Sequence, residues 1–355
     1  MEKLKSVLEL TQMLRMPVAD PADYGIVSRR LQRNSLPFFK VEGETPEGYC
    51  GIEWECAWAP GTTQSRNIYA ALRNIHQRNS LVVNVRESSS DPFYDTADSS
   101  LREAVRRLVF SDRTKLLAQA PHYDGGGIEC VFCPMSLAAI RAAEQEFRIM
   151  FELADDFGFT PLRGGDGIHL NMDLSLYGST MDEQVETCAR MLRFAFANYD
   201  YIVRQSLRRW TYQRNSDIPS MLGDIFRVRS NQELEVLFME QKSRFLDTIR
   251  AGTSLKAFNI GIRTDRRPVL EIRWFGSTTK VAELFSIVDF AFAQAEYFRA
   301  NDTTSLERFA NFVKSTFDEN GLLKYGHLYE HMQANEYSAQ FMNLGTHVPQ
   351  TILVA

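Results

Sequence analysis

Alternation of apolar and polar residues in short segments constrains the fold of this chain more than any other feature of its sequence. Side chains point in turn to opposite faces of a strand, so residues two apart share a face. In Cys50–Trp58, Glu53 and Glu55 therefore share one face and Trp54 lies on the other. Six segments have the length and composition of strands: Cys50–Trp58, Ser80–Arg86, Gly127–Phe132, Gly167–Asp173, Ala257–Thr264 and Pro268–Phe275.

The polar faces of these strands carry a repeated set of residue types. Four of the other predicted strands each have polar residues on one face. These are Glu129 in 127–132, His169, Asn171 and Asp173 in 167–173, Asn259 in 257–264, and Glu271 with Arg273 in 268–275. For Glu53 and Glu55 alone, a solvated edge strand and a metal site are equally good explanations. Several such strands in one sheet make a polar surface with carboxylates, an imidazole and a guanidinium, which a divalent-metal and phosphate site requires.

Each of these residue types suits one part of such a site. Mg²⁺ is a hard cation that prefers carboxylate oxygens and substrate phosphates. The carboxylates would therefore bind metal: Glu53, Glu55, Glu129 and Glu271. Arg273 would hold a phosphoryl oxygen, because guanidinium matches phosphate in a planar, two-point manner. His169 and Asn171 would supply directional hydrogen bonds.

Helix starts are indicated by capping boxes, in which a Ser or Thr is followed three residues later by Glu. These boxes predict four helices. The first runs from Ser100 to about Ala118, the second begins at Thr180, the third runs from Ser230 to Gly252, and the fourth runs from Thr304 to near Gly321. Periodicity predicts two more, Ser136–Phe157 and about Thr279–Arg299. The first sixteen residues form an amphipathic segment that we expect to cover its own domain. Early strands followed by strands alternating with long helices predict an α+β fold, with a largely antiparallel sheet backed by helices.

Composition and charge exclude several classes of protein. With 355 residues and 44% apolar residues, the chain is long enough for a sizeable core, which excludes disordered and collagen-like classes. With a net charge of −5, the chain lacks the excess of basic residues that an indiscriminate nucleic-acid binder needs. Glu9 interrupts any hydrophobic region near the N-terminus, and no stretch approaches the ~18 apolar residues of a membrane span. We therefore expect a cytoplasmic protein with no nucleic-acid or membrane partner.

Other motifs have simpler explanations than a functional site. The five cysteines include a Cys130-x-x-Cys133 pair, but a zinc site requires a second close pair, so packed, reduced thiols are the better interpretation. The glycine-rich run 163–167 precedes a strand and is best explained as a tight turn. The turn that contains Arg267 is explained by solvation of a hairpin or by contact with a nucleotide, and both explanations stay open.

Four motifs in order resemble the amidoligase family, which consists of glutamine-synthetase-like carboxylate–amine ligases. They are Gly51-Ile52-Glu53-Trp54-Glu55, then Gly127-Ile128-Glu129 followed by Pro134-Met135-Ser136-Leu137, then Gly167-Ile168-His169-Leu170-Asn171, and finally Lys256-Ala257-Phe258-Asn259 with Val269-Leu270-Glu271-Ile272-Arg273-Trp274-Phe275-Gly276-Ser277. Order and spacing agree over about residues 48–280. Asn171 is a departure, because the family commonly has a second His at this position.

The resemblance implies a fold, an activity and roles for named residues. The fold would be a curved, largely antiparallel sheet with a concave polar face and helices on the other face. Residues 1–47 would lead into a catalytic domain over 48–300, and 301–355 would form a helical extension. The activity would be ATP- and Mg²⁺- or Mn²⁺-dependent formation of an amide from a small-molecule or peptide carboxylate and an amine or ammonia, through an acyl phosphate. A homo-oligomer is left open.

By the same resemblance, the site residues divide into three groups. The metal ligands would be Glu53, Glu55, Glu129 and Glu271; the catalytic residues Arg273, Glu271 and Glu53; and the cofactor-binding residues His169, Asn171, Asn259, Lys256 and Arg267. The alternative is a catalytically inactive member of the fold that serves as a structural or interaction protein. Asn171 and an aromatic-rich tail favour this alternative, whereas the carboxylates crowded on one face oppose it, because crowding costs electrostatic energy.

Overall fold

The computed structural model describes residues 20–30, 37–58, 116–118, 122–124, 127–156, 159–161, 167–198, 201–202, 236, 260–263 and 269–334. They fall into two compact units. The first contains the chain up to His169 together with 276–281, and the second contains 170–275 and the chain from 282 onward.

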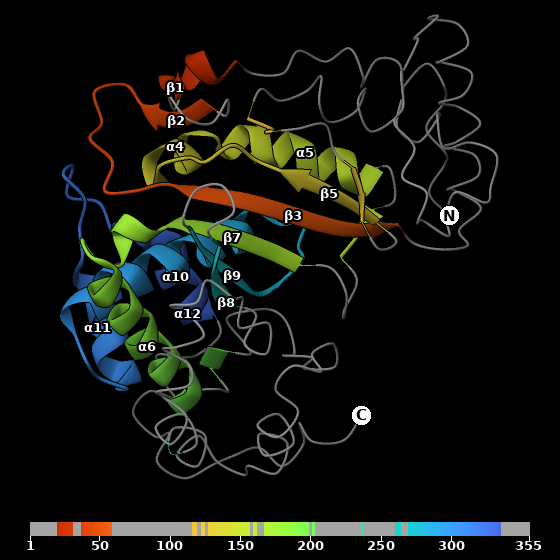
Figure 1. The fold of residues 1–355 in the computed structure, drawn as a ribbon. Helices are drawn as coiled ribbons and strands as arrows, with labels where there is room; N and C mark the ends of the chain where they lie inside the picture. Colours follow the sequence, from red (N-terminus) through yellow and green to blue (C-terminus); the bar gives the residue numbers. More distant parts are fainter. Residues whose placement is uncertain are drawn as a thin grey trace, which may run out of the picture. The chain divides into compact units, whose positions relative to one another are not determined.

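Strands of the first unit build an antiparallel hairpin and one part of a larger sheet (Figure 1). The elements are η1 (Pro21–Tyr24), β1 (Ile26–Arg30), β2 (Pro37–Val41), β3 (Cys50–Trp58), β4 (His122–Asp124), β5 (Gly127–Val131), α4 (Leu137–Ala142), α5 (Glu144–Asp156), β6 (Phe159–Thr160) and the start of β7 (Gly167–Asp173). β1 pairs with β2, β5 pairs with both β3 and β4, and β6 pairs with the end of β3, all antiparallel.

Helix α5 packs on the apolar side of β3 and β5, along which it runs in Figure 1. The rings of Trp54 and Phe151 lie 5.1 Å apart between centroids, and those of Phe132 and Phe147 lie 4.9 Å apart. Aromatic side chains bury the largest apolar areas and prefer such tilted contacts. The apolar back of β3 is therefore covered by a helix, and its polar face is the opposite one.

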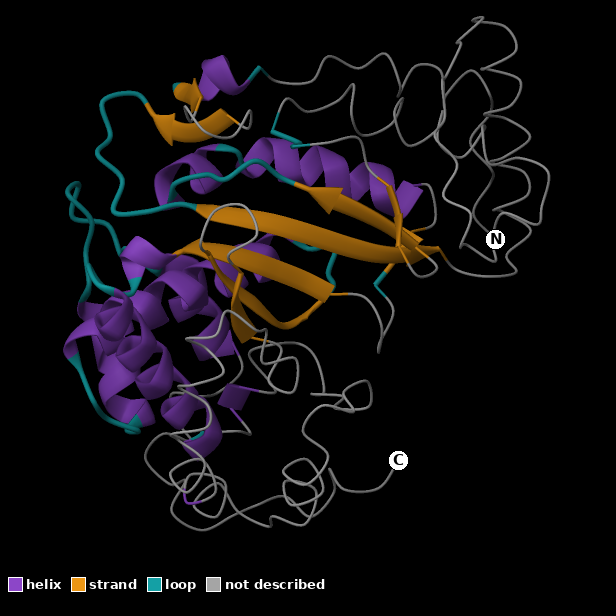
Figure 2. Cartoon of the chain, in the orientation of Figure 1, coloured by secondary structure: helices purple, strands orange, loops and turns teal. Residues whose placement is uncertain are grey.

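One long, buried helix, α10 (Val281–Ala300), forms the core of the second unit. The elements of this unit are the rest of β7, η4 (Leu174–Leu176), α6 (Met181–Ala197), β8 (Ile260–Arg263), β9 (Val269–Gly276), α10 (Val281–Ala300), α11 (Leu306–Ser315) and α12 (Gly326–Ala334). Phe290 of α10 contacts Phe275 of β9, and Phe298 of α10 contacts Phe194 of α6. A helix that is apolar on all sides belongs in a core, and Figure 2 shows α6, α11 and α12 gathered about α10.

Both units mix helices with strands, so the predicted α+β class is confirmed. The registers of five strand pairs are antiparallel, and the strand order β4-β5-β3-β7-β9-β8 describes an open sheet. The predicted strands Cys50–Trp58 and Gly167–Asp173 agree with β3 and β7 in full.

Several predicted helix boundaries are wrong. The helix predicted over 136–157 is two helices, because the backbone leaves helical geometry at Ala143. The helix predicted from Thr304 begins after Ser305, whose hydroxyl accepts from the Arg308 N–H, and it ends at Ser315. The helix predicted to reach Ala118 does not include residues 116–118, since Leu117 bridges to Phe132 as a strand residue.

Other predictions fall outside the described residues. These are the N-terminal sixteen residues, the strand at 80–86, most of the helices at 100–118 and 230–252, and the cofactor-binding candidates Lys256, Asn259 and Arg267. Among the helices that are described, none combines the length and apolarity needed to cross a membrane.

Candidate functional site

Strand β3 separates its apolar and acidic residues as the alternation predicts. Ile52, Trp54 and Cys56 are at most 1% exposed. The side chains of Glu53 and Glu55 retain 15% and 11% exposure on the other face. β3 lies inside the sheet, since β5 pairs along one side and β7 follows on the other. The solvated-edge explanation for these two glutamates is therefore wrong.

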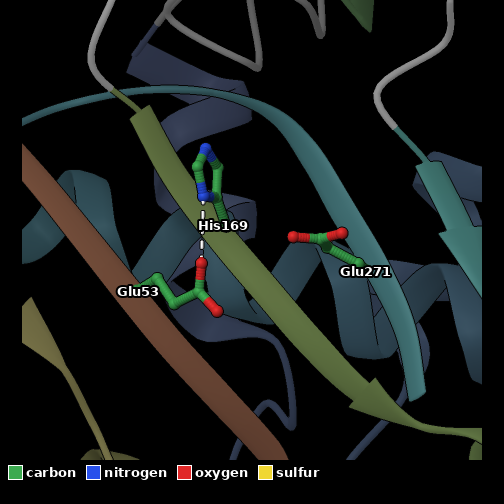
Figure 3. Close-up of side chains that lie close together, drawn as sticks. All are labelled: Glu53, His169 and Glu271. Carbon is green, nitrogen blue, oxygen red and sulfur yellow. Dashed lines mark hydrogen bonds and ion pairs between the residues drawn. The ribbon is translucent and has the colours of Figure 1, made fainter. Parts of the chain in front are cut away.

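The ring of His169 lies against both glutamates. Its Nδ1 is 3.1 Å from Oε2 of Glu53 and 3.4 Å from Oε1 of Glu55, and the histidine is 2% exposed. Figure 3 shows Nδ1 directed at Glu53 and the other ring nitrogen directed away. Both carboxylates thus converge on one imidazole nitrogen that is shielded from solvent.

Glu55 is further oriented by the start of β7. Its Oε2 accepts a hydrogen bond from the backbone N–H of Gly167 at 3.0 Å. This contact leaves Oε1 as the oxygen nearer to His169. This interaction is not predictable from the sequence, because a backbone donor leaves no signal in the residue pattern.

Glu129 has its predicted place on the sheet. It lies directly opposite Glu55 in the β3–β5 register and is half-buried. Residues directly opposite each other in an antiparallel pair share a face. Glu129 therefore lies on the acidic face of β3, which the metal-site hypothesis requires.

Glu271 and Arg273 on β9 form an ion pair. Arg273 Nη1 donates to Glu271 Oε1 at 3.1 Å, with 6% of the glutamate side chain and 43% of the arginine side chain exposed. Burying a carboxylate is costly unless it is paired and hydrogen-bonded, and Arg273 meets this requirement. The arginine remains open enough to contact a ligand.

Three side chains have the geometry of a metal-binding group. Each of Glu53, His169 and Glu271 offers one ligand atom, and these atoms lie within 4.8 Å of one another (Figure 3). Two ligands at right angles on a cation with bonds of ~2.1 Å lie about 3.0 Å apart, which is close to the 3.1 Å between His169 Nδ1 and Glu53 Oε2. Carboxylates suit Mg²⁺ and Mn²⁺, and imidazole suits transition metals. The donors fit a divalent cation, and Mn²⁺ matches both ligand types.

This group shares two members, Glu53 and Glu271, with the predicted ligand set. His169, predicted as a cofactor-binding residue, lies in it, whereas Glu55 and Glu129 do not. Asn171, two residues along β7 and half-buried, lies on the His169 face by alternation. The sequence contained the signal for His169, because it shares a strand face with other polar residues, but periodicity does not tell a ligand from a hydrogen-bond donor.

The cysteines are free and buried, as the sequence predicts for packed thiols. Burial raises the pKa of Cys133 to about 11 and that of Cys188 to about 12, and it also raises the pKa of Cys50. These three thiols stay protonated at neutral pH, as expected for thiols packed in a core.

Comparison with known proteins did not assign the chain to a family. No protein-family model matches the chain, and no curated protein matches its sequence.

Proposed function

We propose that this chain is an ATP-dependent carboxylate–amine ligase that uses Mg²⁺ or Mn²⁺. The observation that carries the proposal is the contact of Glu53 with His169, in a group with Glu271 that has the geometry of metal ligands. The four motifs that resemble amidoligases contain all three residues. The glutamine-synthetase-like sheet, with its concave polar face, is part of this proposal.

The acidic residues would hold the metal against which phosphates bind. Glu53 and Glu271 supply carboxylate oxygens and His169 supplies a ring nitrogen. Glu55 and Glu129, paired opposite each other on the same face, add negative charge that favours cations there. A bound Mg²⁺ neutralises phosphate oxygens and supplies no covalent chemistry of its own.

Arg273 would bind the phosphoryl group as it is transferred. A guanidinium has five N–H donors, and the contact with Glu271 engages Nη1. Since 43% of its side chain is exposed, the remaining donors are accessible to a ligand. Glu271 fixes the arginine, so its orientation is set before phosphate binds, and such preorganisation is the main source of electrostatic catalysis.

The proposed reaction has two steps. A carboxylate oxygen of the substrate attacks the γ-phosphorus of ATP, the bond to the β–γ bridging oxygen breaks, and ADP leaves. The nitrogen of an amine or ammonia then attacks the carbonyl carbon of the acyl phosphate. The bond between this carbon and the phosphate oxygen breaks, inorganic phosphate leaves with the electron pair, and the nitrogen loses a proton to give the amide. In this scheme the protein positions the reactants and neutralises charge.

The test is ATP turnover with matched substrate panels. Purified protein is incubated with ATP, Mg²⁺ or Mn²⁺, and panels of amino acids, peptides and amines, while ADP and phosphate are measured. We expect ADP and phosphate to form only when a carboxylate and an amine are both present. Glu53→Gln, which keeps the shape of the side chain and removes its charge, serves as the background.

The inactive-member alternative predicts a different outcome. Asn171 favours it, because the family commonly has a histidine there. An inactive member would bind metal through Glu53 and His169 but release ADP no faster than Glu53→Gln with any substrate pair. That outcome would contradict the ligase proposal.

A further inference from the structure

The residue between the two acidic side chains of β3 is anchored from the back of the sheet. Trp54 is 1% exposed and donates its indole Nε1–H to the backbone carbonyl of Thr278 at 2.9 Å. The indole also packs on Phe151 of α5. A buried indole N–H generally requires a partner, and here that partner is 224 residues away in the chain.

Ser277, the residue before Thr278, holds the next position of β3. The Ser277 hydroxyl donates a hydrogen bond to the backbone carbonyl of Glu55. Ser277 and Thr278 directly follow Gly276, where β9 ends. We call these two residues the 277–278 clamp. The clamp thus holds Trp54 through its side chain and Glu55 through its backbone.

We propose that the 277–278 clamp positions Glu53 as a metal ligand and Glu55 beside it, an inference that rests on the metal site of the proposed function. Glu53 and Glu55 flank Trp54, so a shift of the backbone at 54–55 moves both carboxylates relative to His169. Metal affinity depends on orienting groups beyond the ligands themselves, and their loss typically lowers it 10- to 100-fold. Ser277 is therefore a positioning residue, which acts on the metal through the backbone of β3.

Ser277→Ala removes the hydroxyl of the clamp, and Ser277→Thr keeps it. Ser315→Ala is the matched control, because Ser315 also donates to a backbone carbonyl, that of Asn311 on α11, away from Glu53 and Glu55. Binding of Mn²⁺ is measured from the electron paramagnetic resonance signal of the free ion, and thermal melting in EDTA reports folding. All binding is measured well below the melting temperature of each variant.

We expect Ser277→Ala to weaken Mn²⁺ binding about tenfold, while Ser277→Thr and Ser315→Ala bind Mn²⁺ as the wild type does. If Ser277→Ala lowers only the melting temperature and leaves Mn²⁺ affinity unchanged, the clamp is structural and the inference is wrong while the metal site stands. If the wild type itself fails to bind Mn²⁺, the metal site of the proposed function is wrong, and the inference is wrong with it.

Discussion

At the scale of single residues, His169 joins the two acidic positions of β3. The sequence predicted that Glu53 and Glu55 share a face, because strand alternation follows from the backbone alone. It did not predict that both carboxylates lie within 3.4 Å of one imidazole nitrogen. Which side chains meet across a sheet depends on strand order and register, and the sequence of one strand determines neither of them.

The charge of Glu271 is expected to matter for metal binding and not for folding. Glu271→Gln keeps the shape of the side chain, and Arg273 remains partly solvated without its partner. We expect near-wild-type melting in EDTA and a large loss of Mn²⁺ affinity, measured by calorimetric titration. Glu186→Gln, on the exposed side of a pair with Arg190, is the control. Lower stability with unchanged Mn²⁺ affinity would instead make Glu271 and Arg273 a structural ion pair.

The planar fork of Arg273 is expected to matter for turnover. Arg273→Lys keeps the positive charge but loses two-point contact with a phosphoryl group. By analogy with other electrostatic stabilisers, we expect ATP turnover to fall by roughly 100-fold. The measurement is ADP release at saturating ATP, with melting in EDTA as the check on folding. Turnover equal to the wild type in a well-folded variant would remove Arg273 from the catalytic residues.

At the scale of elements, the cap of α6 agrees with its sequence signal. The Thr180 hydroxyl accepts from the Glu183 N–H at 3.3 Å, and the Glu183 carboxylate accepts from the Thr180 N–H at 3.3 Å. We expect Thr180→Ala to lower the free energy of unfolding by about 1 kcal/mol and Thr180→Ser to change it little. Urea denaturation measures both. Equal stability of Thr180→Ala and the wild type would show that the cap contributes nothing.

Element boundaries were predictable where a local interaction sets them. Capping at Thr180 involves neighbouring residues, and the two ends of β3 coincide with the ends of its alternating pattern. The interruption at Ala143 has neither glycine nor proline to mark it, so periodicity predicted one continuous helix. Ser305 and Thr304 are both good N-caps, and the sequence alone did not decide between them.

Contacts between elements far apart in the chain could not be predicted from the sequence. Asp289, 1% exposed in α10, accepts from the backbone N–H groups of His327 and Leu328 at the start of α12. No pattern in either segment indicates this cap, which joins residues 38 apart. The same holds for the 277–278 clamp on β3. The sequence predicted which faces are polar, and tertiary packing determined what those faces meet.

At the scale of the whole molecule, the buried thiols predict a loss of stability in alkali. Burial raises the pKa of Cys133 to about 11 and of Cys188 to about 12, above the value of 9.0 for a free thiol. Above pH 9 the unfolded chain loses these protons while the folded protein keeps them, so the unfolded state is favoured as the pH rises.

Each such thiol lowers the free energy of unfolding by about 1.4 kcal/mol per pH unit above its unfolded pKa. Urea denaturation at about pH 8 and about pH 10 measures the change in the wild type and in Cys188→Ala. We expect the wild type to lose more stability than the variant over this interval. An equal loss in both proteins would mean that Cys188 titrates in the folded state as it does in the unfolded chain.

Metal and nucleotide linkage tests the central claim most directly. Thermal melting is recorded for the wild type and Glu53→Gln in EDTA, in Mg²⁺, and in Mg²⁺ with ATP. A ligand that binds only the folded protein stabilises it by about 2.7 kcal/mol at a hundredfold excess over its dissociation constant. We predict that the wild-type melting temperature rises in Mg²⁺ and rises further with ATP, and that Glu53→Gln responds weakly. Identical wild-type melting in all three solutions would contradict the metal- and ATP-dependent ligase.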